Sequence, residues 1–133
     1  MRKTLTESLI ETIELVREGK LDADGRFIET DFAELLEICN ACGAKNSRLP
    51  VPQTAYGMSL KPMCHVHDFD YHAGKTIGNK DMADRRMKNN GQRLIEMRSS
   101  WVLSTLRRAR VYSYYLMVHR FGGPAFWDGK TKS

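Results

Sequence analysis

One segment of this 133-residue chain concentrates side chains that could catalyse a reaction. Cys64, His67 and Tyr71 recur at spacings of three and four, which places them along one face of a helix, with Asp68 turned about 100° away. A histidine can remove a proton from water, and a carboxylate beside it can bind a hard cation that stabilises an oxyanion. If the next helix packs antiparallel, Asp84 can reach the far nitrogen of His67 and accept a hydrogen bond from Tyr71. This pattern indicates calcium-assisted ester hydrolysis.

The same residues also have a structural interpretation. A histidine on a helix is commonly a surface or packing residue, and Tyr71 has the character of a core aromatic. Asp68 and Asp84 would then be ordinary carboxylates, the second beside Arg85. The residue types leave both interpretations open.

The cysteines allow a different metal. Two residues separate Cys39 from Cys42, two separate Cys64 from His67, and twenty-one lie between the pairs. Three thiolates and an imidazole suit tetrahedral Zn²⁺. This alternative predicts a zinc protein that binds nucleic acid, and replacing Cys39 with serine would abolish its metal binding.

Charge divides the chain into two unequal parts. Residues 1–84 hold 10 Lys and Arg against 14 Asp and Glu, whereas residues 85–133 hold 11 against 2. The basic part suits an anionic membrane, a nucleic acid or an acidic protein, with Arg107, Arg108 and Arg110 as contacts. No apolar run spans a bilayer and no signal peptide is visible, so we expect a single domain in the cytoplasm of a host cell, or one carried in a virion.

Hydrophobic periodicity predicts a mostly α-helical fold without a strand pair. We expect helices over residues 5–17, 31–38, 61–72, 80–97 and 100–120, and a short extended piece at 26–28. Pro62 and Gly74 suit the ends of the third helix, Asn79 caps the fourth, and a break is expected near Asn90-Gly91. Residues 40–59 are rich in Gly and Pro and are expected to form a long binding loop.

The last helix and the tail complete the expected core. Phe126 and Trp127 are expected to anchor the tail, and the methionines Met82, Met87 and Met97 to fill core gaps. The helix over 100–120 is expected to bury six large apolar side chains: Trp101, Leu103, Leu106, Tyr114, Tyr115 and Val118.

The Cys64-x-x-His67-Asp68-x-x-Tyr71 arrangement resembles the active-site helix of the phospholipase A₂ superfamily. Ala83-Asp84-Arg85 is similar to the following helix of that family, and Cys42-Gly43 to its calcium loop. A closer resemblance is to small phage and prophage proteins with a phospholipase A₂-like core. They share the segments Cys42 to Lys45, Gly57 to Ser59, Tyr114-Tyr115 and Phe121 to Trp127.

The resemblance implies an architecture and a set of roles. Residues 39–128 would form a phospholipase A₂-like core of antiparallel helices with a long metal-binding loop, and residues 1–38 an N-terminal helical extension. His67 would be the general base, Asp84 its orienting partner and Tyr71 its support. The ligands of the calcium ion would be the carboxylate of Asp68 and carbonyls near Ala41, Gly43 and Lys45. The family's disulfide would pair Cys42 with Cys64.

Two functions follow from this resemblance. The first is hydrolysis of a glycerophospholipid ester at a membrane surface. The second is a catalytically inactive protein of the same fold, encoded by a phage, that binds and inhibits an acidic host protein. Replacing His67 would abolish the first function and leave the second intact.

Overall fold

The computed structural model describes residues 4–39, 54–127 and 130. They are mostly α-helical, with seven helices and one two-stranded hairpin. The helices are α1 (Leu5–Arg17), α2 (Gly25–Glu29), α3 (Phe32–Cys39), α4 (Lys61–Ala73), α5 (Ile77–Arg98), α6 (Trp101–Phe121) and α7 (Gly123–Phe126), and the strands are β1 (Thr54–Ala55) and β2 (Met58–Ser59).

Local sequence signals set the ends of the central helices. Pro62 lies in the first turn of α4, where its missing N–H costs no hydrogen bond. Gly74 follows the last turn of α4 and donates its N–H to the carbonyl of Asp70. Thr76 and Asn79 form a reciprocal capping box that starts α5. The helix therefore begins at Ile77, three residues before the predicted start, because Thr76 and not Asn79 is its N-cap.

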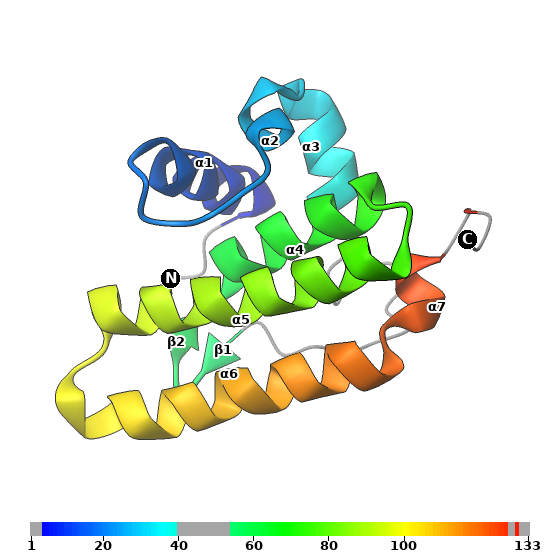
Figure 1. The fold of residues 1–133 in the computed structure, drawn as a ribbon. Coiled ribbons are helices and arrows are strands. Elements are labelled where there is room, and N and C mark those ends of the chain that lie inside the picture. The colour runs from blue at the N-terminus through cyan, green and yellow to red at the C-terminus, as the bar shows by residue number, and fades with distance from the viewer. Residues whose placement is uncertain (1–3, 40–53, 128–129, 131–133) are drawn as a thin grey trace.

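Three long helices lie side by side and surround the main core (Figure 1). Helix α5 lies between α4 and α6 in the chain and contacts both of them. The main cluster of buried side chains comes mainly from α4, α5, α6 and the hairpin, with Leu15 of α1 and Leu21, and it includes Met63, Met87, Leu94, Val111 and Val118. Burial of these side chains supplies most of the driving force for docking the three helices.

The N-terminal helices cover the other side of α4. Leu9, Phe27 and Leu35 form a second cluster with Val66 and Phe69 of α4. The rings of Phe27 and Phe69 meet edge to face, with centroids 5.5 Å apart. Helix α4 is therefore buried on both sides, which explains why nearly every residue from Pro62 to Phe69 is buried.

Besides the start of α5, four further local predictions were wrong. Residues 26–28 lie in the helix α2, because the Asp24 side chain caps it by accepting from the Arg26 N–H. The predicted loop contains a hairpin whose two-residue turn, Tyr56-Gly57, has positive φ at both positions. A two-residue turn with positive φ at both positions has a backbone twist that matches the twist of the two strands it connects. Helix α5 continues without a break through Asn90 and Gly91.

The fourth error concerns burial. Trp101 is 86% exposed and Leu106 is also exposed, because the side of α6 that faces the core carries Val111, Tyr114 and Val118. Met87 fills the core as expected, whereas Met82 and Met97 are exposed. Phe126 is fully buried and Trp127 packs against it, so the prediction for the tail is confirmed.

No helix among the described residues is both long enough and apolar enough to cross a membrane.

Candidate active site

Helices α4 and α5 form an antiparallel pair that brings the predicted residues together (Figure 1). The imidazole Nε2 of His67 lies 3.0 Å from Oδ1 of Asp84. The hydroxyl of Tyr71, one turn further along α4, donates to the same oxygen at 2.7 Å. The geometry expected across the two helices is thus present.

Lys80 completes the environment of Asp84, and sequence reasoning missed it. Its Nζ lies 2.8 Å from Oδ2 of Asp84 and 3.1 Å from the carbonyl oxygens of both Val118 and His119. The two carbonyls belong to the last turn of α6, where the helix dipole favours a cation. Only 3% of the Lys80 surface is exposed. The signal in the sequence was its i,i+4 spacing from Asp84, but a lysine at such a spacing is usually on the surface.

The surroundings of Asp84 keep it ionised. Burial by itself pushes the pKa of this carboxyl upward, but hydrogen bonds from His67, Lys80 and Tyr71 outweigh burial and lower the pKa below its usual value. Its exposed fraction is 0%, so solvent does not screen these contacts. Asp84 is therefore a buried anion that accepts from three different donors.

An ionised Asp84 determines which nitrogen of His67 carries the proton. A carboxylate can only accept, so the Nε2 of His67 must donate to it. In the neutral ring, the lone pair is then on Nδ1. This is the tautomer that a general base needs when its orienting carboxylate lies on the opposite side of the ring.

Tyr71 acts as a fixed donor and as a packing surface. Burial, together with the adjacent charge of Asp84, raises the pKa of Tyr71, so its hydroxyl stays protonated. The Tyr71 ring lies 4.1 Å from the His67 ring and meets the Phe126 ring edge to face at 5.2 Å. Helix α7 therefore restrains His67 indirectly, through Tyr71.

The expected calcium site is only partly within the described residues. Asp68 follows His67 on α4 and is partly buried. Its proposed companions Ala41, Gly43 and Lys45 lie outside the described residues. Within the ranges 4–39, 54–127 and 130, no group of three or more His, Cys, Asp or Glu side chains is arranged to hold a metal ion.

The predicted zinc ligands belong to separate surroundings as far as the structure describes them. The Cys39 thiol lies 3.5 Å from the carbonyl oxygen of His65, in the cluster under the N-terminal helices. Cys64 is a buried free thiol in the main core. Because Cys64 is a free thiol, it does not form the disulfide to Cys42 that the resemblance implies. Cys42 itself lies outside the described residues, so the zinc alternative stays a prediction.

All three arginines expected to face a partner make contacts within the chain. Arg107 donates to the carbonyl oxygens of Ala55 and Tyr56, at 3.1 and 2.7 Å, and so attaches the hairpin to α6. Arg108 donates to Gln92 of α5 at 3.0 Å. The Arg110 guanidinium lies over the ring of Tyr56, 5.2 Å from its centroid.

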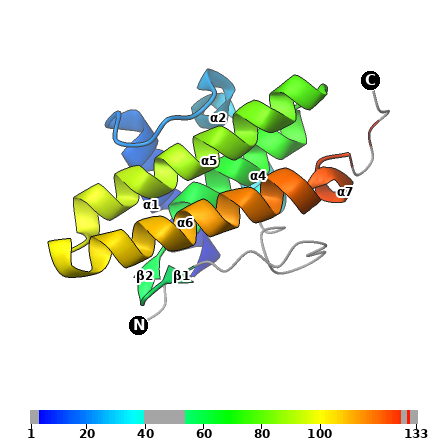
Figure 2. The ribbon, with the colours of Figure 1, turned by 60° about the horizontal axis from the view of Figure 1, so that its bottom comes forward.

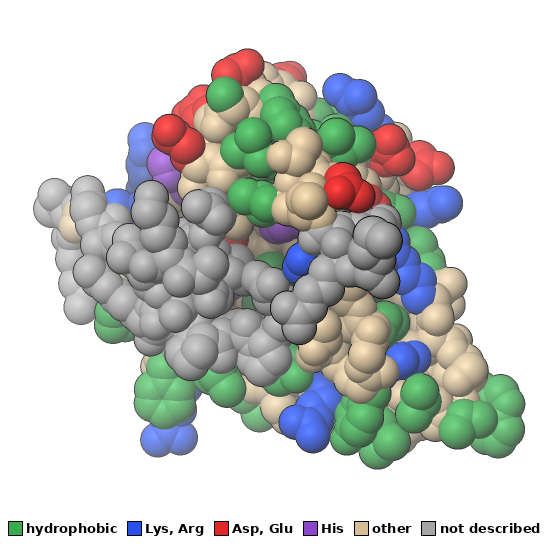
Figure 3. All heavy atoms as spheres, turned by 180° about the vertical axis from the view of Figure 1, so that it is seen from behind, with side chains coloured by type: hydrophobic (Ala, Val, Ile, Leu, Met, Phe, Trp, Pro, Cys, Tyr) green, Lys and Arg blue, Asp and Glu red, His purple; other side chains and the backbone are tan. Residues whose placement is uncertain are grey.

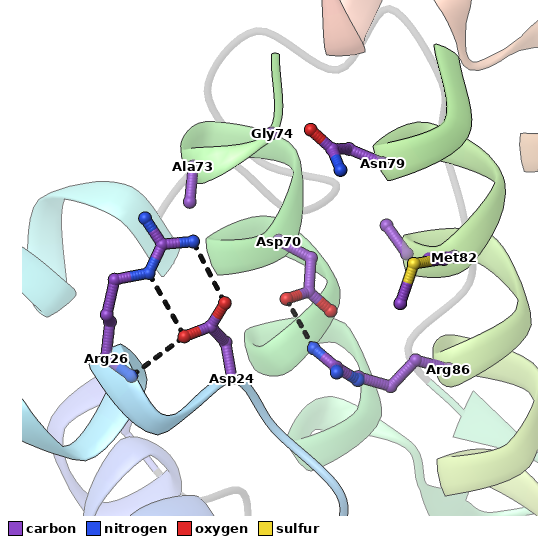
Figure 4. A pocket seen from close by; sticks show the side chains of 9 residues that line it. Asp24, Arg26, Asp70, Ala73, Gly74, Asn79, Met82 and Arg86 are labelled. Atoms are coloured by element: carbon purple, nitrogen blue, oxygen red, sulfur yellow. Dashed lines mark hydrogen bonds and ion pairs between the residues drawn. The ribbon is translucent and has the colours of Figure 1, made fainter. Parts of the chain in front are cut away.

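A second polar cluster lies between α2, α4 and α5, around an open pocket (Figure 4). Asp24 is paired with Arg26, and Asp70 with Arg86 at 2.9 Å. The second carboxylate oxygen of Asp70 is buried without a hydrogen-bond partner. Burial therefore raises the pKa of Asp70 to about 6, although Arg86 opposes that change. The Asp70–Arg86 pair therefore joins α4 to α5 electrostatically, whereas the Asp24–Arg26 pair lies within the start of α2.

The arrangement around His67 can thus supply a base with its proton on the correct nitrogen, held by a buried anion. Among the described residues, the sequence did not indicate Lys80, His119, whose Nδ1 lies 3.7 Å from Oδ2 of Asp84, or Phe126 as the support of Tyr71. Comparisons of this chain with protein-family models, with curated proteins and with solved structures found no match.

Proposed function

We propose that this chain is a phospholipase A₂-like hydrolase that cleaves an ester of a glycerophospholipid with the assistance of calcium. The observation that carries the proposal is the contact between His67 Nε2 and Asp84 Oδ1, at 3.0 Å, in a buried setting with Tyr71 on the same oxygen. A histidine with no catalytic role gains little from an ionised carboxylate placed behind it with three donors. The antiparallel α4–α5 pair also suits a phospholipase A₂-like core.

His67 acts as the general base in this proposal. Its Nδ1 takes a proton from a water molecule, and the resulting hydroxide attacks the ester carbonyl carbon. Asp84 holds the ring in place and stabilises the imidazolium that forms. His67 then returns the proton to the leaving alkoxide, which completes the hydrolysis and restores the neutral ring.

The donor chemistry beside His67 fits a calcium ion. Asp68 offers a hard carboxylate oxygen directly after the proposed base, and Ca²⁺ prefers such oxygens together with backbone carbonyls. Asp68 and the carbonyls of Ala41, Gly43 and Lys45 would hold the ion. When bound, calcium supplies Lewis-acid polarisation of the ester carbonyl.

Fatty-acid release from mixed phospholipid vesicles tests the proposal. The full chain is compared with His67→Ala, and with His72→Ala as a matched control, because His72 is an exposed histidine on the same helix. We expect calcium-dependent release that a chelator removes. We also expect His67→Ala to reduce the release by about 100-fold or more, and His72→Ala to leave it unchanged.

The result that would end the hydrolase proposal is an absence of release, with or without calcium, from protein whose circular dichroism shows folded helices. Equal loss in both histidine variants would also contradict it. The inactive protein that binds an acidic host protein would then be the better candidate.

A further inference from the structure

Helix α6 has an outer side that no other element of the described residues covers. Its inner side packs through Val111, Tyr114 and Val118. Figure 1 shows α6 along the lower edge of the molecule, and Figure 2, in which this edge is turned forward, shows it across the front. Six exposed side chains lie on its outer side over four turns, and we call them the α6 outer stripe: Trp101, Val102, Leu106, Ala109, Tyr112 and Leu116.

The α6 outer stripe differs from an ordinary solvent-facing helix side. The other exposed residues from Trp101 to Leu116 are Thr105, Ser113 and Arg110, and Arg110 is the one charged residue among them, at the border of the stripe four residues after Leu106. Trp101 and Val102 are 86% and 61% exposed. The neighbouring α5, in contrast, exposes Arg85, Arg93 and Glu96. A contiguous apolar stripe of this kind usually marks an interaction surface.

Cations border the stripe, and several of them lie against aromatic rings. The Lys88 Nζ lies 4.8 Å from the centroid of the Tyr115 ring, on the α5 side. Arg110 lies over Tyr56 on the hairpin side, and Arg120 over Phe121 at the end of the helix. No Asp or Glu occurs anywhere in α6.

The wider surface has the same asymmetry. Figure 3 shows hydrophobic, Lys and Arg side chains over the lower part of the face in view, while the acidic side chains in view lie over its upper part, beside further Lys, Arg and hydrophobic side chains. The whole region around α6 is therefore complementary to an anionic partner. It is unsuited to pairing with a second copy of itself, because Lys88, Arg110 and Arg120 would meet like charges.

We propose that the α6 outer stripe docks on an anionic lipid surface. An uncovered helix with an apolar side and flanking Lys and Arg is the form that enters the boundary between headgroups and acyl chains. Trp101 and Tyr112 have rings that favour this boundary, and Lys88, Arg110 and Arg120 lie where lipid phosphates would meet them. The docking is independent of hydrolysis, so it can fail or succeed separately from the proposed function.

Vesicle binding of the full chain tests this proposal, in the presence of a chelator so that no hydrolysis intervenes. The vesicles are phosphatidylcholine alone or phosphatidylcholine with phosphatidylglycerol. Leu106→Glu is compared with Ile10→Glu, because the two wild-type residues have matched exposures of 46% and 45% and Ile10 is on α1. We expect binding to the anionic vesicles only, weakened by salt, and weakened about tenfold or more by Leu106→Glu but not by Ile10→Glu.

Fluorescence provides a second measurement. The chain has two tryptophans, so Trp127→Phe leaves Trp101 as the reporter. Its emission should shift to shorter wavelength with the anionic vesicles. Absence of binding by the folded wild type, or equal binding by Leu106→Glu and Ile10→Glu, would overturn the proposal. So would a dimer in sedimentation velocity that Leu106→Glu dissociates, because a second copy would then cover the stripe.

Discussion

Asp84 is the residue on which the candidate site depends. Its two oxygens accept from an imidazole, a phenol and an ammonium, and all of these groups are buried. Lys80 matters most for stability among them, because it is a full charge that is only 3% exposed. The same ammonium also donates hydrogen bonds to two backbone carbonyl oxygens in the last turn of α6. One side chain therefore links the proposed catalytic pair to the third helix.

A double-mutant cycle on Lys80 and Asp84 tests this link. Lys80→Met keeps the length of the side chain but leaves Asp84 as a buried anion with one fewer donor, so we expect a loss of about 3–5 kcal/mol in the free energy of unfolding. Asp84→Asn should cost a similar amount, because it leaves the Lys80 cation without a counter-charge. The double variant should lose clearly less than the two single losses together.

The measurement is urea unfolding followed by circular dichroism. Lys75→Met serves as the control, since Lys75 is an exposed lysine just before α5 and should change stability by less than about 0.5 kcal/mol. Additive losses in the cycle would show that Lys80 and Asp84 do not interact in the folded chain.

At the scale of elements, Gly91 explains why α5 and α6 approach so closely. A Cβ at this position would lie 2.7 Å from Cγ1 of Val111 and 2.8 Å from the sulfur of Met63. The sequence suggests a helix break at Asn90-Gly91, since glycine is a poor helix former. The structure uses the missing side chain for packing instead, while Asn90 is buried and bonds through its amide to the backbone of Asp22.

Gly91→Ala and Gly78→Ala should therefore have opposite effects on stability. Alanine at 91 gains helix propensity but must displace a stiff, fully buried valine, so we expect a net loss of about 1–2 kcal/mol. At Gly78 the nearest atom to a new Cβ is 3.7 Å away, so alanine should stabilise the chain by about 0.5–1 kcal/mol. Thermal unfolding of the two variants measures both. Stabilisation by Gly91→Ala would contradict the packing role of that glycine.

At the scale of the whole molecule, buried polar contacts attach the N-terminal helices to α4 and α5. The Thr12 hydroxyl donates to the Ser8 carbonyl, so at 2.9 Å it accepts from the Nδ1–H of His65. Arg86 bridges Asp22 and Asp70 across the same junction. Residues 4–39 are thus docked on α4 by specific polar contacts in addition to their apolar cluster.

Two groups at this junction make its stability depend on pH in opposite directions. Burial lowers the pKa of His65 to about 4. The stabilisation of the folded chain by neutral His65 is therefore fully present above about pH 6.5 and is lost as the pH falls to 4. Burial raises the pKa of Asp70 from its ordinary value of 3.8 to about 6. The stabilisation of the folded chain by protonated Asp70 is therefore fully present below pH 3.8 and is lost as the pH rises to 6. Each group changes the free energy of unfolding by about 3 kcal/mol over its range. Between about pH 4 and 6 the two changes have opposite signs and largely cancel.

Removing one group should reveal the other. As the pH falls from 6.5 to 4, we expect the unfolding free energy of Asp70→Asn to decrease by about 3 kcal/mol, because only His65 remains. As the pH falls from about 6 to 4, we expect the unfolding free energy of His65→Gln to increase by a similar amount, because only Asp70 remains. Urea unfolding at several pH values measures both slopes. Asp24, whose hydrogen bonds with Arg26 lower its pKa to about 2, affects stability only below this range. Parallel slopes in the two variants would show that these groups do not control the junction.

The positions of the helices followed from the sequence because their causes are local. The apolar period of residues 5–17, Pro62 and Gly74 all act within a few residues of one another. The cluster of His67, Tyr71 and Asp84 could be predicted for the same reason, since helical spacing aligns the first two and a tight turn must bring α5 back along α4. The turn residues Tyr56-Gly57 were a local signal too, but their strands are too short to show an alternating pattern.

Only the tertiary structure decided which side of each helix is covered. Trp101 and Leu106 have the character of core residues, yet they are exposed because, within residues 4–39 and 54–127, the core packs against the opposite side of α6. Lys80 has the character of a surface residue, yet it is buried because the end of α6 lies above Asp84. Burial depends on which distant segments meet. The sequence alone determines the elements and the chemistry they carry, while their packing determines which side chains form the site and which remain for a partner.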